Sequence, residues 1–447
     1  MKRILKKDSI IQASFFAALL MGYCFLAGVS LFIPLLTMIF AFHLVVFRGA
    51  DHKRLMHVGL LLALAAFAAS AIRMDERISV YYIPVASIPM LAMLLFSEMQ
   101  LAFSMSFMAS ALVSLIAGTG SDHLLILFTG SVAAAYAVRD TRTRGTIWRA
   151  GLLVSLVQVL GYLLFHPSID LVVFKQALKP LFLNGFICAG FVIATLKVFE
   201  YLFGELTAFS LLELSDSLNQ PLLKRLAFEA PGTYHHSLVL SNIAGAAADE
   251  IRANQLLTRV GAYYHDIGKL VKPEYFTENQ MMTDNKHDSL EPSMSRLVIL
   301  NHVKEGVEIA QKEGLNSKII DFIEQHHGTS VIHYFYQKAL ETDVEDDVEE
   351  ETYRYPGPKP QTKEVAIVML ADAVEAATRS LEEHSPTKIE EVVRRVVNNK
   401  FIDGQLDECN LTLREIEKIG SSFSRVLNAM YHVRVKYPHA AKKTNGH

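Results

Sequence analysis

Five histidines and two aspartates in the second half of the chain have the residue types and the surroundings of a catalytic metal site. The set consists of His236, the adjacent His265 and Asp266, His302, the adjacent His326 and His327, and Asp372. Imidazole and carboxylate together form the usual ligand set of a catalytic first-row metal. One carboxylate such as Asp266 could bridge two ions, and a pair about 3.5–4 Å apart suits in-line attack on a phosphodiester.

A single histidine is more often structural or exposed than a ligand, so the prediction depends on the joint pattern. Each member stands beside an expected helix end or in an apolar helix face. Asp372 lies in such a face, where a buried carboxylate needs a metal or another cation, or must face a cleft. Lys269, one turn beyond His265, either reaches a phosphate oxygen or is exposed after a helix end. His287 and His333 lack this context and are expected at the surface or behind the ligands.

The elements that must position these residues are helices, because apolar residues recur around them at helical spacing. Helices are expected at 237–251, 256–267, 296–311, 317–326, 364–381, 389–399 and 413–433. Gly328 follows the paired histidines as a natural C-cap. An acidic run at 341–351 and a segment at 355–360 rich in Pro and Gly are expected to form a surface excursion between two helices. No run alternates as a strand would, so this half is predicted to be all-α.

The first half is predominantly apolar and predicts a polytopic bundle of transmembrane helices. Eight spans are expected at about 10–28, 31–47, 55–72, 80–97, 101–118, 122–138, 150–166 and 180–203. Basic clusters at 2–7, 48–54 and 139–149 fall on one side if there are eight spans, and that side also receives the second half. Seven spans would place the basic N-terminus outside. A cleaved signal peptide is disfavoured, because further apolar segments follow the first instead of polar sequence.

The expected organisation is 1–203 transmembrane, 204–228 a connecting helix or linker, 229–436 the catalytic domain and 437–447 a disordered tail. The net charge of −3 does not favour a nucleic-acid polymer as partner. The lipid bilayer is the expected environment of the first half. The three cysteines form no CxxC pair, so neither a disulfide framework nor a thiolate zinc site is indicated.

Several motifs resemble those of the seven-transmembrane HD family of bacteria, over residues from about 80 to 435. They are EAPGTYHHS at 229–237, YYHDIGK at 263–269, QHHGT at 325–329, PGPKPQTK at 356–363 and LADAVEA at 370–376. The resemblance implies a multi-pass protein of the bacterial inner membrane with its HD domain in the cytoplasm. It also implies a phosphodiesterase that opens cyclic di-AMP to linear pApA with two divalent metal ions, iron or manganese.

By the same resemblance, His236, His265, Asp266 and Asp372 would bind one metal. Asp266 would bridge to a second metal held by His302 and His326. His327 would be a further ligand or would contact phosphate, and Asp266 and Lys269 are expected to act in catalysis. Lys269 is also expected to bind substrate. Family members usually carry an extracytoplasmic sensor domain after the first span, where this chain has only residues 29–30. The sequence specifies neither the input signal nor whether the chain forms a homodimer.

Four other functions are considered. An HD-GYP enzyme acting on cyclic di-GMP would carry Gly-Tyr-Pro after the paired histidines, and this chain continues Gly328-Thr329-Ser330. A guanosine tetraphosphate hydrolase would need a smaller set of metal ligands, and the presence of His302 and His326 argues against it. A non-catalytic cyclic-dinucleotide receptor is disfavoured by the complete ligand set, and a transporter by the scarcity of ionisable residues in the spans.

Overall fold

The computed structural model describes residues 32–48, 52–74, 77–167, 171–217, 219–280, 285–342 and 348–431. The chain divides into two compact units, Met1–Phe209 and Ser210–His447. Both units are helical, and across the described ranges the only extended pairing is one isolated bridge between Val331 and Arg354. The prediction of an all-α protein is therefore confirmed.

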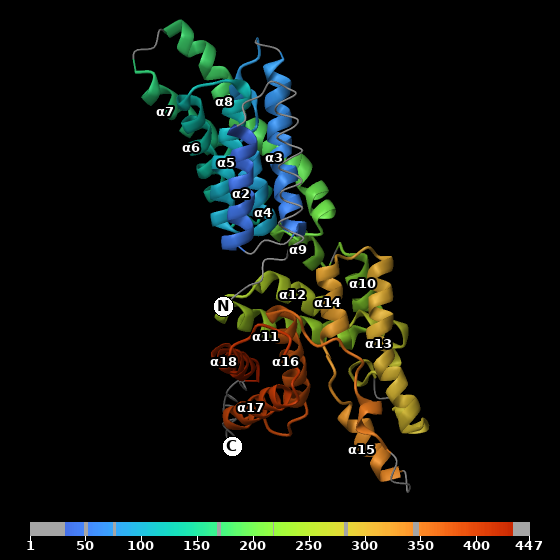
Figure 1. The fold of residues 1–447 in the computed structure, drawn as a ribbon. Helices are drawn as coiled ribbons and strands as arrows, with labels where there is room; N and C mark the ends of the chain where they lie inside the picture. Colours follow the sequence, from blue (N-terminus) through green and yellow to red (C-terminus); the bar gives the residue numbers. More distant parts are fainter. Residues whose placement is uncertain are drawn as a thin grey trace, which may run out of the picture. The chain divides into compact units, whose positions relative to one another are not determined.

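The first unit is a bundle of apolar helices (Figure 1). Its helices are α2 (Phe32–Arg48), α3 (His52–Arg73), α4 (Ser87–Phe96), α5 (Met99–Ala117), α6 (Ser121–Val138), α7 (Arg144–Phe165) and α8 (Leu171–Phe203). Among the described residues, α3 and α5 to α8 are long and apolar enough to cross a membrane, and two shorter apolar helices accompany them. The predicted span at 10–28 lies outside the described residues.

The predicted fourth span is not one continuous helix. A 3-10 turn, η1 (Val80–Tyr82), is separated from α4 by a short irregular segment that contains Pro84. Proline has no backbone N–H and disfavours a helical residue before it, which accounts for the break. The buried side chain of Asn184 on α8 donates to the carbonyls of Tyr81 and Ile83 at 2.6 and 2.7 Å. The Ile83 carbonyl also accepts from the backbone N–H of Val85 at 2.8 Å, so Asn184 adds to the pairing of the carbonyls at this helix break.

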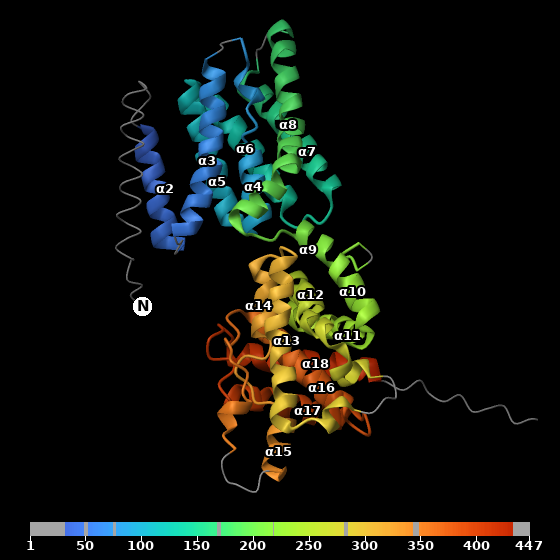
Figure 2. The ribbon, with the colours of Figure 1, turned by 90° about the vertical axis from the view of Figure 1, so that its right-hand side faces the viewer.

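Two other predicted spans begin earlier than expected. The seventh helix starts at Arg144 instead of 150, so part of the predicted basic loop belongs to α7. The eighth starts at Leu171 instead of 180 and runs through Pro180. Helices α6, α7 and α8 pack in sequence against one another (Figure 2).

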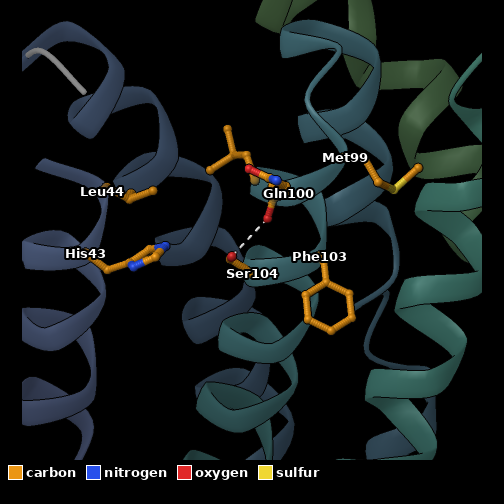
Figure 3. Close-up of a pocket in the computed structure, with 7 residues that line it drawn as sticks. His43, Leu44, Met99, Gln100, Phe103 and Ser104 are labelled. Carbon is orange, nitrogen blue, oxygen red and sulfur yellow. Dashed lines mark hydrogen bonds between the residues drawn. The ribbon is translucent and has the colours of Figure 1, made fainter. Parts of the chain in front are cut away.

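A cavity of about 530 Å³ lies between α2 and α5 (Figure 3). It is lined by His43, Leu44, Met99, Gln100, Leu101, Phe103 and Ser104. The Ser104 hydroxyl donates to the Gln100 carbonyl of the same helix at 2.9 Å. The described lining includes one imidazole and no carboxylate, so it does not provide the ligand set of a catalytic metal. The predicted site belongs to the other unit.

The second unit packs α11, α12, α16, α17 and α18 around one core. Its helices are α10 (Pro221–Glu229), α11 (Pro231–Glu250), α12 (Gln255–Tyr264), α13 (Pro292–Lys312), α14 (Ser317–Gln325), α15 (His333–Thr342), α16 (Lys363–Arg379), α17 (Pro386–Ile402) and α18 (Leu413–Tyr431). A further helix, α9 (Ala208–Ser215), crosses the division between the units. Residues 204–228, expected as a connection, thus contain α9 and most of α10. Leu240, Leu370 and Phe423 are fully buried and hold α11, α16 and α18 together.

The helices of this unit differ from the expected ones at two places. The helix expected to end at 267 ends at Tyr264 and continues as the 3-10 segment η2 (Ile267–Val271). Helix α15 was not expected, although Phe335 and Ala339 have helical spacing and are buried. The segment at 355–360 has no regular structure, as predicted. Residues 343–347 of the acidic run and the tail at 437–447 lie outside the described residues.

Candidate metal centre

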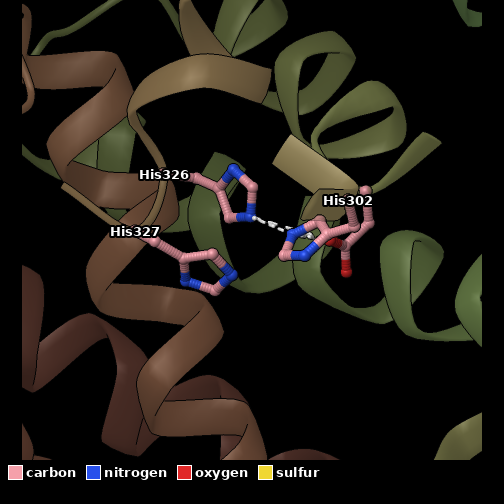
Figure 4. A group of neighbouring side chains, drawn as sticks. His302, His326 and His327 are labelled. Carbon is pink, nitrogen blue, oxygen red and sulfur yellow. Dashed lines mark hydrogen bonds and ion pairs between the residues drawn. The ribbon is translucent and has the colours of Figure 1, made fainter. Parts of the chain in front are cut away.

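The structure brings all seven predicted residues together in the second unit. His236 lies in the second turn of α11, His302 in the middle of α13 and Asp372 in α16, whereas His265 and His326 are the C-cap residues of α12 and α14. The possible ligand atoms form two groups, and within each group all atoms lie within 4.8 Å of one another. Asp266 belongs to both groups. One group is Asp266, His302, His326 and His327, and the other is His236, His265 and Asp266. Figure 4 shows the rings of His302, His326 and His327 converging.

Two glycines allow the backbone approaches that assemble this cluster. A Cβ on Gly268 would lie 1.8 Å from the carbonyl oxygen of His302, so η2 lies directly against α13. This contact brings Asp266 to His302. A Cβ on Gly232 would likewise lie 1.8 Å from the carbonyl oxygen of Glu278, in the 3-10 turn η4 (Thr277–Asn279). Any larger residue at either position would force the two backbones apart.

Three of the histidines have their tautomer fixed by a backbone carbonyl. The Nδ1 atom of His265 lies 2.8 Å from the carbonyl oxygen of Ala262. The Nδ1 atom of His302 lies 2.5 Å from the oxygen of Ile299, and that of His326 lies 2.9 Å from the oxygen of Ile323. A carbonyl oxygen only accepts, so Nδ1 carries the proton in each ring. In the neutral form of such a ring, the Nε2 atom offers a lone pair, and this is the form that binds metal.

These three lone pairs converge on one carboxylate. The Nε2 atom of His265 lies 3.2 Å from Asp266 Oδ2. The Nε2 atoms of His302 and His326 lie 3.3 and 3.6 Å from Asp266 Oδ1. All four side chains are buried, and within the described part of the chain His265 Nε2 and Asp266 Oδ1 have no hydrogen-bond partner. Three Nε2 atoms around one buried carboxylate call for positive charge between them, either protons or a bound metal. The nitrogen and oxygen donors fit divalent transition metals.

His236 lies between two carboxylates, one of which the sequence analysis missed. Its Nε2 is 3.1 Å from Asp372 Oδ1, and its Nδ1 is 3.0 Å from Glu375 Oε2. Burial lowers the pKa of His236, but the hydrogen bonds to both carboxylates outweigh burial and raise it to about 10. This position therefore calls for a positive charge, either a proton or a metal. A carboxylate behind a ligating histidine is the usual means of orienting its ring.

Lys269 packs against the cluster and is largely covered, so the alternative of an exposed lysine after a helix end is wrong. Its Nζ lies 2.8 Å from Asp266 Oδ2 and 2.7 Å from Glu278 Oε1, and its side chain is only 14% exposed. Burial lowers the pKa of Lys269, but the two carboxylates outweigh this effect and raise it. Lys269 thus holds Asp266 in place. Glu278 had no sequence signal, because it lies in the short 3-10 turn η4, outside any apolar helical pattern. A direct contact between Lys269 and phosphate stays a prediction.

His327 is the most exposed of the five histidines and lies flat against a buried tyrosine. Its ring stacks on Tyr355 with centroids 4.2 Å apart, and its Nδ1 is 4.0 Å from Asp372 Oδ2. Burial and the neighbouring His326 and His302 hold the pKa of His327 well below its usual value. A neutral ring there could act as a ligand or contact a phosphate. Tyr355 comes from the Pro- and Gly-rich segment, which sequence reasoning treated only as a surface excursion.

The two histidines set aside in the sequence are also placed. His333 is exposed, as expected. His287 is buried, with Nε2 2.9 Å from the Tyr275 carbonyl and its ring against Phe335, so a surface position is wrong for it. It belongs to neither group of ligand atoms and serves packing instead.

Comparison with known proteins identifies relatives over both units. The family profile "7TM receptor with intracellular HD hydrolase" matches residues 9–207, and the profile "HD domain" matches residues 233–377. The cyclic-di-AMP phosphodiesterase PgpH of Listeria monocytogenes is 42% identical over 364 residues, which are 80% of this chain and 50% of that protein. PgpH of Bacillus subtilis is 45% identical over 260 residues, 58% of this chain and 36% of that protein.

A crystal structure of the L. monocytogenes PgpH HD domain in complex with cyclic di-AMP is 50% identical in sequence to this chain. The match covers 49% of this chain and 100% of that one, with a TM-score of 0.46. This chain spans about half the length or less of the two curated relatives described above. The profile match and the five long apolar helices indicate a membrane protein. The chain belongs to the family of 7TM receptors with an intracellular HD hydrolase.

Proposed function

We propose that this chain is a membrane-bound, metal-dependent phosphodiesterase that hydrolyses cyclic di-AMP to linear pApA. The observation that carries the proposal is the shared carboxylate of Asp266, on which ligand atoms from two groups converge. A carboxylate common to two adjacent sites is suited to a pair of divalent ions. The choice of cyclic di-AMP is supported by the two relatives named as cyclic-di-AMP phosphodiesterases.

The residues divide into two ligand sets. His236, His265, Asp266 and Asp372 would hold one ion, and Asp266, His302 and His326 would hold the other. Iron and manganese both suit this mixture of imidazole and carboxylate. Two bound ions would activate water and offset the negative charge that develops on the phosphate.

The remaining residues keep these ligands in position or meet the substrate. Lys269 holds Asp266 through one ion pair and is itself held by Glu278. Glu375 accepts a hydrogen bond from Nδ1–H of His236 and so would keep Nε2 directed at a metal in the centre. His327 is neutral and partly exposed beside Asp372, which suits contact with a phosphate oxygen.

We further propose that residues 229–436 form the HD domain, that this domain lies in the cytoplasm, and that the first half is a multi-pass region in the bacterial inner membrane. The basic clusters at 2–7, 48–54 and 139–149 support this orientation. Reporter fusions at Lys7, Arg77 and Arg144 should report inside, outside and inside. An N-terminus found outside would contradict the arrangement. Whether the chain forms a homodimer would be measured on the full chain purified in detergent.

The test of function uses the purified full chain with Mn²⁺ or Fe²⁺ and a panel of cyclic dinucleotides, with products identified by mass. Cyclic di-AMP should disappear and pApA should be the main early product. Consumption of cyclic di-GMP alone, or of guanosine tetraphosphate alone, would overturn the substrate. Tight binding of cyclic di-AMP with no product, in fully metal-loaded protein, would favour a receptor over an enzyme.

A further inference from the structure

A cavity of about 420 Å³ opens beside the ligand His236. It is lined by Gly232, His235, His236, Thr277, Glu278 and Arg379. These residues come from the start of α11, from η4 and from the last turn of α16. Because His236 belongs to both the cavity and the metal cluster, a molecule held at the metals can extend into this space.

A cyclic dinucleotide carries two phosphodiesters, and only one of them is at the metals during cleavage. The other phosphate keeps its negative charge and needs a cation when it is removed from water. Lys269 does not meet this need, because its ammonium already faces the two carboxylates of Asp266 and Glu278 at 2.8 and 2.7 Å. The cation for the second phosphate must therefore come from elsewhere on the cavity wall.

Arg379 is the cationic residue that lines this cavity with a largely unengaged side chain. It lies seven residues after Asp372 on α16, two turns along the same face. Its side chain is 46% exposed, and its Nη1 is 3.6 Å from Glu375 Oε1. That contact uses one side of a guanidinium that has five N–H donors in a fork suited to phosphate. Glu375 thus anchors Arg379 with one oxygen and His236 with the other.

We propose that Arg379, with the exposed ring of His235 beside it on the cavity wall, binds the phosphodiester that is not being cleaved. The inference rests on the proposed function and deepens it. Metals held at the cluster would accept any accessible phosphodiester, whereas Arg379 would select substrates that carry a second phosphate at the far end of the cavity. Glu278, the carboxylate on this wall, is paired with Lys269, so it leaves the positive charge of Arg379 available to an anion.

The test compares two substrates on the full chain. Cyclic di-AMP has a second phosphate, and bis(p-nitrophenyl) phosphate has one phosphodiester only. Arg379→Gln should raise KM for cyclic di-AMP on the order of 10- to 100-fold, the usual effect of losing a hydrogen bond between charged groups. The change for bis(p-nitrophenyl) phosphate should be at least about tenfold smaller. Arg379→Lys should recover part of the loss, because it restores the charge without the fork.

Arg394→Gln is the matched control, since Arg394 is 73% exposed on α17 and pairs only with Glu390 among the described residues. It should leave both substrates unaffected. Equal losses for both substrates in Arg379→Gln would mean that Arg379 acts through Glu375 and His236, and would overturn the inference. No loss for either substrate would overturn it as well. A wild-type chain that cleaves bis(p-nitrophenyl) phosphate and no cyclic di-AMP would instead refute the proposed function, which is a separate outcome.

Discussion

Replacing Gly268 by alanine tests whether the close backbone approach of η2 and α13 assembles the metal centre. The new Cβ would lie 1.8 Å from the His302 carbonyl oxygen and 2.6 Å from the Gly306 nitrogen. Both neighbours are backbone atoms, so no flexible side chain can turn aside. Ordinary contact begins at 3.4 Å, and the two segments must therefore separate by roughly 1.5 Å.

A displacement of this size exceeds the tolerance of a metal site, in which ligand distances vary by about 0.2 Å. Gly268→Ala should lower the free energy of unfolding by about 1–3 kcal/mol, the usual cost of overpacking. Bound metal should fall, and turnover of cyclic di-AMP should drop on the order of 100-fold. The assays are metal content by elemental analysis, thermal unfolding and turnover of the purified full chain.

Gly420→Ala is the matched control in the same unit. A Cβ on Gly420 would meet only the Val393 side chain at 3.8 Å, which is an ordinary contact. Gly420 lies inside α18, where alanine has a higher helix propensity than glycine. This variant should keep its metal and gain slightly in stability. Full metal content and wild-type turnover in Gly268→Ala would refute the reasoning, since they would show that His302 and Asp266 do not depend on this approach.

Three further substitutions probe the surroundings of the ligands. Glu375→Gln should weaken metal binding about 10- to 100-fold, because His236 loses its charged partner; unchanged metal affinity by competition with a chelator would count against this role. Lys269→Met removes the cation from the buried Asp266 and the partly buried Glu278 and should cost about 3–5 kcal/mol in unfolding free energy, so a variant as stable as wild type would contradict the ion-pair geometry. His287→Ala should keep its metal but lose about 1–3 kcal/mol with the hydrogen bond to Tyr275. Burial holds the pKa of His287 below its usual 6.5, so the stability it confers is present above about pH 6.5 and is lost as the pH falls through the folded-state pKa. The stability difference between wild type and His287→Ala should therefore shrink on acidification, and a difference independent of pH would contradict the assignment.

The seven residues of the cluster were predictable from sequence, because each is a polar residue in or beside an apolar helical pattern. The supporting residues were harder to find. Glu375 had a usable signal, since it follows Asp372 by three residues on one apolar helix and so lies one turn away. Glu278 had none, because its contact with Lys269 depends on how the irregular segment between η2 and α13 folds back onto the first turn of α11. Tyr355 was hidden for the same reason in a segment rich in Pro and Gly.

The membrane half shows a similar division between local and non-local causes. Apolar runs predicted where helices would occur, and the proline at position 84 accounts for the interruption of the fourth span that the structure shows. The start of α8 at Leu171 was missed, because Lys175 and Lys179 reduce the apolar character of its first turns. The bonds from Asn184 to Tyr81 and Ile83 join positions about a hundred residues apart, and local pattern does not reveal them.

The most direct measurement is metal content together with product identity for wild type and Asp266→Asn, purified as the full chain and supplied with Mn²⁺ or Fe²⁺ and cyclic di-AMP. Since Asp266 belongs to both groups of ligand atoms, wild type should hold two ions per chain and release pApA, and Asp266→Asn should lose both ions and the activity. The matched variant His287→Ala should retain both ions. Retention of two ions by Asp266→Asn would contradict the shared-carboxylate site. A wild type that is fully loaded with metal, consumes cyclic di-GMP and leaves cyclic di-AMP untouched would contradict the substrate.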